Sequence, residues 1–174
     1  MRLPIPGRSS TFAIGRSSRI DSPLKALEAA PIELDMPNLK PSDFGAGRSD
    51  EERANVRTVV AFYETLLNEK DIEAARRYVG SHYRQHSPLA ADGFEGLRAF
   101  LVPMFERHPQ MRCEIKRAFA DRDFVILHVH ARLGPEDRGA AVVDIFRLEA
   151  GKIVEHWDVL QQIPESAPNA NSMI

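Results

Sequence analysis

Three ionisable residues interrupt an apolar stretch near the end of the chain, DIFRLEAGKIVEHWDV at residues 144–159. Asp144, His156 and Asp158 stand where a strand with an ordinary core would have Val or Leu. A charged group at such a position must be paired, neutralised or in contact with a wet cavity. A carboxylate among apolar groups also has its charged form disfavoured, so it can accept a proton near neutral pH and return it elsewhere. These residue types therefore point to proton transfer.

Whether the three side chains meet depends on the loop between the two strands of this hairpin. With a two-residue loop, Asp144 would pair with Trp157, and the other two polar groups would point to the opposite face. With a three-residue loop, 149–151, Asp144 would pair with His156, and all three polar side chains would share one face. The last residue of a three-residue loop is commonly in the left-handed conformation, and Gly151 suits that position. We therefore predict the three-residue loop.

Further polar residues could reach the same cavity. His128 and His130 are two apart in FVILHVHARL, so they share a face of a strand, but the sequence leaves open which face. If that face is covered by helices, both could donate to a substrate oxygen. The substrate-binding candidates are His128, His130, His86, Gln85, Tyr63 and Trp157. Histidines with a carboxylate could instead hold iron or zinc, but we predict neither a metal nor a cofactor.

Helical patterns precede the strands. Ser49 and Glu52 form a capping-box signature, and an apolar stripe follows at helical spacing to Leu67. A second, short helix is predicted from Asp71, as its N-cap, to Gly80, as its stop. The segment FEGLRAFLVPMFERHP predicts a third helix, which Pro103 should kink or split.

The period of the apolar residues changes to two from about residue 111. MRCEIKRAFA, FVILHVHARL and the two halves of the final hairpin predict a four-strand antiparallel meander. Three helices followed by such strands predict an α+β fold, with the helices on one face of a curved sheet.

The first 48 residues differ in composition from the rest, because they hold six of the chain's 12 prolines. We predict an N-terminal extension at 1–48 without an independent fold, a domain at 49–163 and a C-terminal tail at 164–174. The apolar residues spaced along the extension could anchor it to the domain or to a partner subunit.

The net charge of −2 gives no electrostatic reason to expect a nucleic acid or an anionic membrane as a partner. No apolar run approaches the roughly 20 residues of a membrane span, and the single cysteine, Cys113, allows no internal disulfide. We expect a soluble cytoplasmic protein. Apolar residues on the other face of the last hairpin predict a homodimer packed sheet to sheet: Val143, Ile145, Ile153, Trp157 and Val159.

Three segments resemble a known family: NVRTVVAFYETLLNEKDIEAARRYV, YRQHSP and DIFRLEAGKIVEHWDVLQ. They are similar to the SnoaL-like polyketide cyclase branch of the nuclear transport factor 2-like superfamily, over roughly residues 50–163. The resemblance implies a cone: a curved antiparallel sheet packed with three helices around a pocket. It also implies that Asp158 is the general acid/base and that His156 is a pocket histidine. Asp144 takes the place of an assisting histidine in the aldol-cyclase members.

The chemistry that fits these residues is cofactor-independent proton transfer on a small carbonyl compound, of the lyase or isomerase type. Asp158 would act as general base, with Asp144 and His156 as its partners. The alternative is a non-catalytic domain that binds a small ligand on the same fold.

Overall fold

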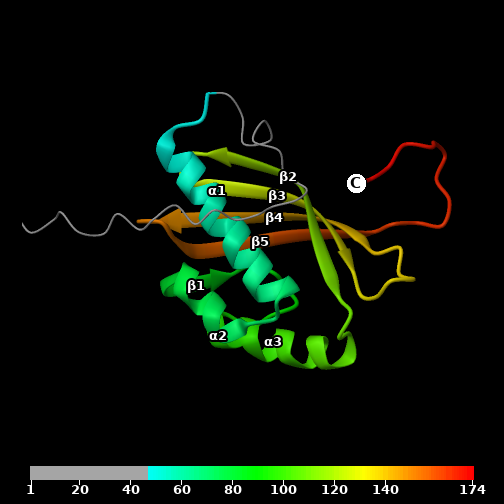
Figure 1. Ribbon diagram of the computed structural model, residues 1–174, viewed down its shortest axis with the longest axis horizontal. Coiled ribbons are helices and arrows are strands. Elements are labelled where there is room, and N and C mark those ends of the chain that lie inside the picture. Colours follow the sequence, from blue (N-terminus) through cyan, green and yellow to red (C-terminus); the bar gives the residue numbers. More distant parts are fainter. Residues whose placement is uncertain (1–46) are drawn as a thin grey trace, which may run out of the picture. The chain divides into compact units, whose positions relative to one another are not determined.

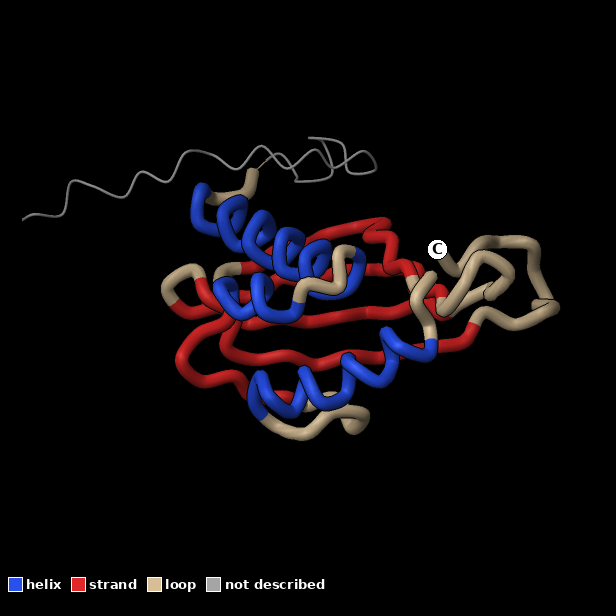
Figure 2. Tube along the Cα trace, turned by 60° about the horizontal axis from the view of Figure 1, so that its bottom comes forward, coloured by secondary structure: helices blue, strands red, loops and turns tan. Residues whose placement is uncertain are grey.

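The computed structural model describes residues 47–174, so the extension predicted at 1–48 lies outside the described residues except for its last two. In that part of the chain, no helix is both long and apolar enough to cross a membrane. The fold is α+β, with three helices against one curved sheet (Figures 1 and 2). The helices are α1 (Asp50–Tyr63), α2 (Ile72–Ala75) and α3 (Gly93–Arg107). The strands are β1 (Val79–Gln85), β2 (Arg112–Asp121), β3 (Phe124–Arg132), β4 (Ala140–Glu149) and β5 (Lys152–Gln162).

The predicted capping box begins α1. The backbone N–H of Glu52 donates to the Ser49 hydroxyl at 3.1 Å, and the Ser49 N–H donates to the Glu52 carboxylate at 2.7 Å. These two bonds satisfy amides that a helix start leaves without partners. The helix ends at Tyr63 and continues as a single π-helical turn, Glu64–Asn68. Tyr63 is thus held at the junction of two helix types, pointing to the sheet.

The second helix is shorter than predicted. Asp71 is its N-cap, as expected, since its carboxylate accepts from the Ala74 N–H at 2.9 Å. The prediction of Gly80 as the helix stop is wrong: α2 ends at Ala75, a 3-10 turn follows, and Gly80 lies in β1. A Cβ at Gly80 would stand 2.9 Å from a methyl of Val154, so a strand with a side chain there could not approach β5 so closely. The third helix runs unbroken through Pro103.

The four predicted antiparallel strands are confirmed as β2–β5, in a sheet of order β1-β5-β4-β3-β2. The fifth strand, β1, pairs in parallel with β5 and was expected only as a short extended piece. Figure 1 shows α1 lying across one face of the sheet, with β1 at the edge near α2 and α3. We call the face toward α1 the inner face and the opposite one the outer face.

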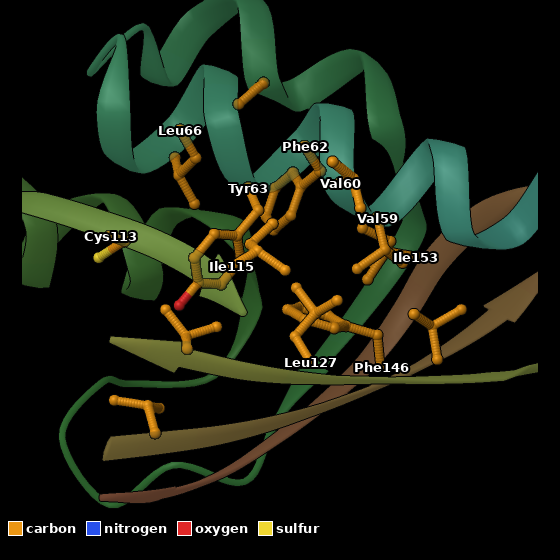
Figure 3. Packing of buried hydrophobic residues seen from close by; sticks show 14 of the residues in the cluster. Val59, Val60, Phe62, Tyr63, Leu66, Cys113, Ile115, Leu127, Phe146 and Ile153 are labelled. Atoms are coloured by element: carbon orange, nitrogen blue, oxygen red, sulfur yellow. The ribbon is translucent and has the colours of Figure 1, made fainter. Parts of the chain in front are cut away.

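The inner face carries the core. Phe62, Tyr63 and Leu66 point from the first helix and its π turn toward the sheet, which contributes Leu127 and Phe146 to the same core (Figure 3). All five are almost completely buried. Phe62 and Tyr63 each meet the Phe146 ring edge to face, with centroids 6.0 and 6.4 Å apart. Burial of such aromatic and aliphatic side chains is the main stabilising contribution to the domain.

The final hairpin turns differently from the prediction. Glu149 pairs with Lys152, so the loop has two residues, Ala150 and Gly151, both with positive φ (49° and 73°). A three-residue loop was therefore wrong, although Gly151 does adopt the left-handed conformation.

On the turn alone, Asp144 would face away from His156. However, the register shifts by one residue between Arg147 and Leu148, because Leu148 pairs with Ile153 while Arg147 pairs with Glu155, which leaves Val154 of β5 without a partner in β4. This bulge inserts one residue into β5 and reverses the alternation of the side chains beyond it. Asp144 consequently pairs with Asp158, not with His156 as predicted, and all three polar residues lie on the inner face.

Candidate functional site

A cavity of about 210 Å³ lies between the inner face of the sheet and the helices. Its polar end is built by side chains from four elements: Tyr63 of α1, Tyr83 and Gln85 of β1, Asp144 of β4, and His156 and Asp158 of β5. The remaining wall is mainly apolar and comes largely from α3 and the sheet, including Leu97, Phe100, Met104, Val142, Phe146 and Leu160. None of the described residues that line the cavity is a Lys or an Arg.

Asp144 is the centre of the polar contacts. Its side chain accepts a hydrogen bond from the Tyr63 hydroxyl at 2.9 Å through Oδ2. Its other oxygen, Oδ1, lies 3.0 Å from Nε2 of His156. Asp144 is 5% exposed and His156 is 8% exposed, so water does not substitute for these contacts. A buried carboxylate with two such partners is the arrangement that offsets its loss of hydration.

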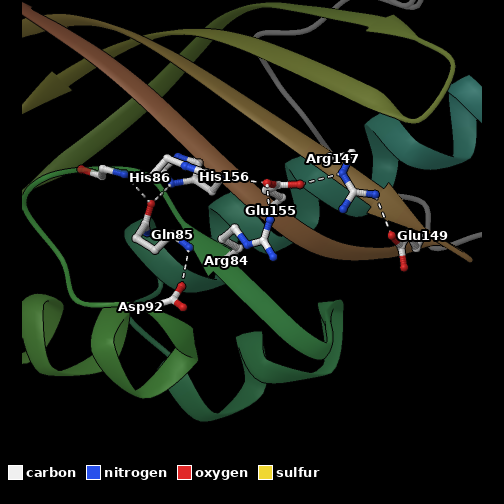
Figure 4. Close-up of polar contacts among 9 residues, drawn as sticks. Arg84, Gln85, His86, Asp92, Arg147, Glu149, Glu155 and His156 are labelled. Atoms are coloured by element: carbon white, nitrogen blue, oxygen red, sulfur yellow. Dashed lines mark hydrogen bonds and ion pairs between the residues drawn. The ribbon is translucent and has the colours of Figure 1, made fainter.

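His156 has a second partner. Its Nδ1 lies 2.8 Å from the side-chain oxygen of Gln85, which comes from the neighbouring strand β1 (Figure 4). The Phe146 ring stacks on the imidazole, with centroids 4.7 Å apart. The imidazole is therefore fixed in its plane by a polar atom at each nitrogen and packed on its face.

Asp158 completes the group. It is half-buried and lines the cavity, and it offers an oxygen within 4.8 Å of the ligand-type atoms of Asp144 and His156. Among residues 47–174, no side chain or backbone group hydrogen-bonds its carboxylate, so this oxygen can accept a proton from a bound molecule.

The same three side chains lie close enough to one another to suggest a cation site. Asp144 and His156 are, however, already joined at hydrogen-bond distance, and the other Asp144 oxygen already accepts from Tyr63. Both Asp144 oxygens and Nε2 of His156 thus have hydrogen-bond partners within the protein.

Two phenols and a thiol in the wall remain protonated. Burial, reinforced by the charge of Asp144, raises the pKa of Tyr63 well above its usual value. The same two causes raise the pKa of Tyr83. Burial, again with the Asp144 charge, raises the pKa of the Cys113 thiol to about 12. Cys113 is thus no nucleophile at neutral pH, since the thiolate is the reactive form, whereas the phenols can donate hydrogen bonds.

Several predicted binding residues lie elsewhere. His128 and His130 alternate with the buried Leu127 and Val129, so they are on the outer face, not in the cavity. His128 Nδ1 lies 2.8 Å from a guanidinium nitrogen of Arg117, and His130 Nε2 lies 2.7 Å from the Arg138 carbonyl. Their role as donors to a substrate oxygen is therefore wrong. The sequence pattern left their face open because both faces of this strand carry apolar residues.

His86 and Trp157 are also on the outer side. Their rings stack with centroids 4.5 Å apart. His86 Nε2 lies 2.8 Å from the Glu155 carboxylate, which also accepts from Arg147 at 2.8 Å, and Figure 4 labels these three residues. The hydrogen bonds from His86 and Arg147 hold the pKa of Glu155 below its usual value. The predicted pocket roles of His86 and Trp157 are wrong, since both rings lie on the outer face, where Trp157 was also expected as part of the dimer surface.

Tyr63 and Gln85 do line the cavity, together with Phe100 and Met104. Tyr83 was missed. It lies two residues before Gln85 in the same strand, and their side chains hydrogen-bond at 3.2 Å. The alternation within YRQ could have identified it, had this segment been taken as a full strand of the sheet.

Comparisons with known proteins find the same fold in solved structures. A candidate SnoaL-like polyketide cyclase from Jannaschia sp. CCS1 is 21% identical, with a TM-score of 0.55 over 67% of this chain and 91% of its own. TsrD from Streptomyces laurentii is 21% identical, with a TM-score of 0.53 over 62% of this chain and 89% of its own. AclR, a candidate hydroxylase from Streptomyces galilaeus, is 20% identical, with a TM-score of 0.54 over 65% of this chain and 82% of its own.

These likenesses establish a shared fold. No curated protein sequence matches the chain significantly. The family model of the SnoaL-like domain matches residues 59–156, which is more than half of the chain and includes Tyr63, Gln85, Asp144 and His156. The chain therefore belongs to the SnoaL-like family, within the nuclear transport factor 2-like superfamily.

Proposed function

We propose that this protein is a cofactor-independent general acid/base enzyme, of the lyase or isomerase type, that acts on a small carbonyl compound. The convergence of Asp144, His156 and Asp158 at the polar end of an apolar cavity supports this proposal most strongly. Placing three titratable groups there costs hydration energy that a simple apolar binding site need not lose. A base beside a second proton-carrying group can remove a proton at one atom and return it at another.

The contacts suggest how the roles are divided. Asp158, whose carboxylate lies at the cavity and has no hydrogen-bond partner in the described chain, is the general base. Asp144 and His156 form a buried hydrogen-bonded pair, and this pair acts as the general acid beside Asp158. The phenol of Tyr83 lies at the same end of the cavity and only accepts from Gln85, so its proton could be donated to a developing enolate oxygen, whereas the Tyr63 proton is already donated to Asp144.

The charges of the cavity define the class of substrate. Two carboxylates and no basic side chain but His156 line it in the described chain, so an anionic group would meet like charges without a counter-ion. We therefore propose a neutral, mostly apolar molecule with its carbonyl at the polar end. Asp144 replaces the histidine that the resemblance to aldol cyclases implies, so the proposal covers small carbonyl compounds in general and not polyketides alone.

A non-catalytic ligand-binding domain is the second candidate. The observation in its favour is that the Asp144 carboxylate is fully engaged by Tyr63 and His156. Against it stands Asp158, which a binder of neutral ligands would have no reason to keep without a partner at the cavity. The cytoplasmic location and the homodimer remain parts of the proposal.

The test is hydrogen exchange at carbon α to a carbonyl, followed by NMR in heavy water. 2-Tetralone, a neutral bicyclic ketone, and a ring-carboxylated analogue are incubated with the protein at equal concentration. We expect faster loss of the α-proton signal for the neutral ketone than in buffer, and a smaller acceleration for the carboxylated compound. Binding of neutral ketones without any acceleration of exchange would favour the non-catalytic domain.

A further inference from the structure

The amide of Gln85 has an orientation that its neighbours determine. The backbone N–H of Ser87 donates to Gln85 Oε1 at 3.0 Å, and Gln85 Nε2 donates to the Tyr83 hydroxyl at 3.2 Å. The oxygen and nitrogen of an amide are assigned from such a network. A backbone N–H can only donate, so the atom that faces Ser87 must be the oxygen. The reversed amide would place an NH₂ group against another N–H.

This orientation decides which nitrogen of His156 carries a proton. Gln85 Oε1 also lies 2.8 Å from His156 Nδ1, and an amide oxygen can only accept. Nδ1 must therefore carry a hydrogen. The other nitrogen, Nε2, lies 3.0 Å from Asp144 Oδ1. His156 is thus placed between two acceptors, while a neutral imidazole has only one N–H.

We propose that Gln85 is a positioning residue that makes Asp144 and His156 share one proton between Oδ1 and Nε2. Two arrangements satisfy all contacts: an imidazolium beside a carboxylate, or an Nδ1–H imidazole beside a carboxylic acid whose proton is on Oδ1. Each holds the same single proton and has a net charge of zero. The arrangement that Gln85 excludes is a carboxylate with a neutral Nε2–H imidazole, because it sets two lone pairs against each other at Nδ1.

The titratable groups around the pair differ in their effect on that proton. From α1, Tyr63 donates to the other oxygen of Asp144 at 2.9 Å, which stabilises the carboxylate and does not itself favour the proton. From β5, Asp158 brings a second carboxylate within 4.8 Å. Tyr83 of β1 and Cys113 of β2 line the same cavity, and burial raises the pKa of both, so neither supplies a negative charge. A proton on the pair prevents two unbalanced carboxylates from facing each other in the cavity.

The catalytic use of this proton rests on the proposed function. Asp158 would remove a proton from the substrate carbon, and the Asp144–His156 pair would supply its own proton to the substrate. The location of the proton does not depend on catalysis. It is a property of the resting protein and can be measured without a substrate.

Nitrogen-15 NMR of the histidine side chains tests the proposal on the full chain. The sequence has six histidines, and the signals that are missing from the spectrum of a His156→Asn variant are those of His156. We expect a protonated Nδ1 for His156 at neutral pH. Gln85→Leu removes the acceptor, so His156 should change to the neutral Nε2–H form that donates to the Asp144 carboxylate. Gln85→Glu retains an acceptor and should retain the proton on Nδ1.

Tyr83→Phe is the matched control. It removes the partner of the Gln85 nitrogen but leaves the Ser87 N–H, so the amide and the His156 signals should stay as in the wild type. A neutral Nε2–H form in the wild-type protein would overturn the proposal, even if the Gln85→Leu protein does not fold. So would an unchanged His156 signature in a folded Gln85→Leu protein. Failure of the α-proton exchange assay would refute the enzymatic role and leave this result unaffected.

Discussion

The hydrogen bond from the Tyr63 hydroxyl reduces the free-energy cost of burying the Asp144 carboxylate inside the domain. It donates to Oδ2 at 2.9 Å from the end of α1, where the π turn begins. The sequence predicted Tyr63 as a residue of the cavity, but it does not show which side chain the Tyr63 hydroxyl contacts. The residue types therefore predicted which residues belong to the site, but they did not predict which of these residues contact each other.

At the residue scale we predict that Tyr63→Phe destabilises the protein. The phenyl ring still fills the core, but the buried Asp144 loses a donor, which costs about 1–3 kcal/mol of unfolding free energy. Urea unfolding at neutral pH measures the change. Tyr78→Phe is the control, because the Tyr78 hydroxyl only accepts from Arg77 at an exposed site and its loss should cost less than about 0.5 kcal/mol. Equal losses in both variants would contradict this account of Asp144.

At the element scale, the prediction for the final hairpin was correct in its result but was based on the wrong turn. It predicted that Asp144, His156 and Asp158 share a face, and they do, but the cause is a two-residue turn followed by a bulge in β5. A bulge has no marker in the hairpin sequence, and here it lies where β1 approaches β5 at Gly80 and Val154. Its position depends on a strand that is distant in sequence.

The turn itself gives the second prediction. Ala150 has a φ of 49°, a conformation that costs a residue with a Cβ about 1 kcal/mol, whereas Asn is favoured at this position of a two-residue hairpin turn. Ala150→Asn should therefore raise the unfolding free energy by up to about 1 kcal/mol. Thermal and urea unfolding check this. Gly151→Ala should lower it by a similar amount, and a stable Gly151→Ala protein would show that the turn is not as described.

At the scale of the whole molecule, the sequence predicted the α+β class, the three helices and four of the five strands. The strand β1 was underestimated because it is short and polar, and parallel pairing with β5 leaves no local signal in the chain. The outer face of the sheet was predicted to be apolar, and Phe119 and Val159 are 51% and 67% exposed there. Ile153, which was expected on that face, is instead fully buried in the core.

This outer face gives the third prediction. We expect a homodimer packed through it, because a patch of large apolar side chains on an uncovered sheet commonly marks an interface. Val159→Glu should convert the dimer to a folded monomer in light scattering after size exclusion. Leu133→Glu, an exposed apolar residue just after β3, should leave the mass unchanged. A wild-type monomer at micromolar concentration would contradict the prediction.

The most direct test of the central claim, that Asp158 is a base at the polar end of the cavity, is the rate of α-proton exchange of 2-tetralone in heavy water. Asp158→Asn keeps the size of the side chain but removes the base, so exchange should slow by about 10²–10⁴-fold while ketone binding persists. His128→Asn, on the outer face, should exchange at the wild-type rate. Wild-type exchange by the Asp158→Asn protein would contradict the account.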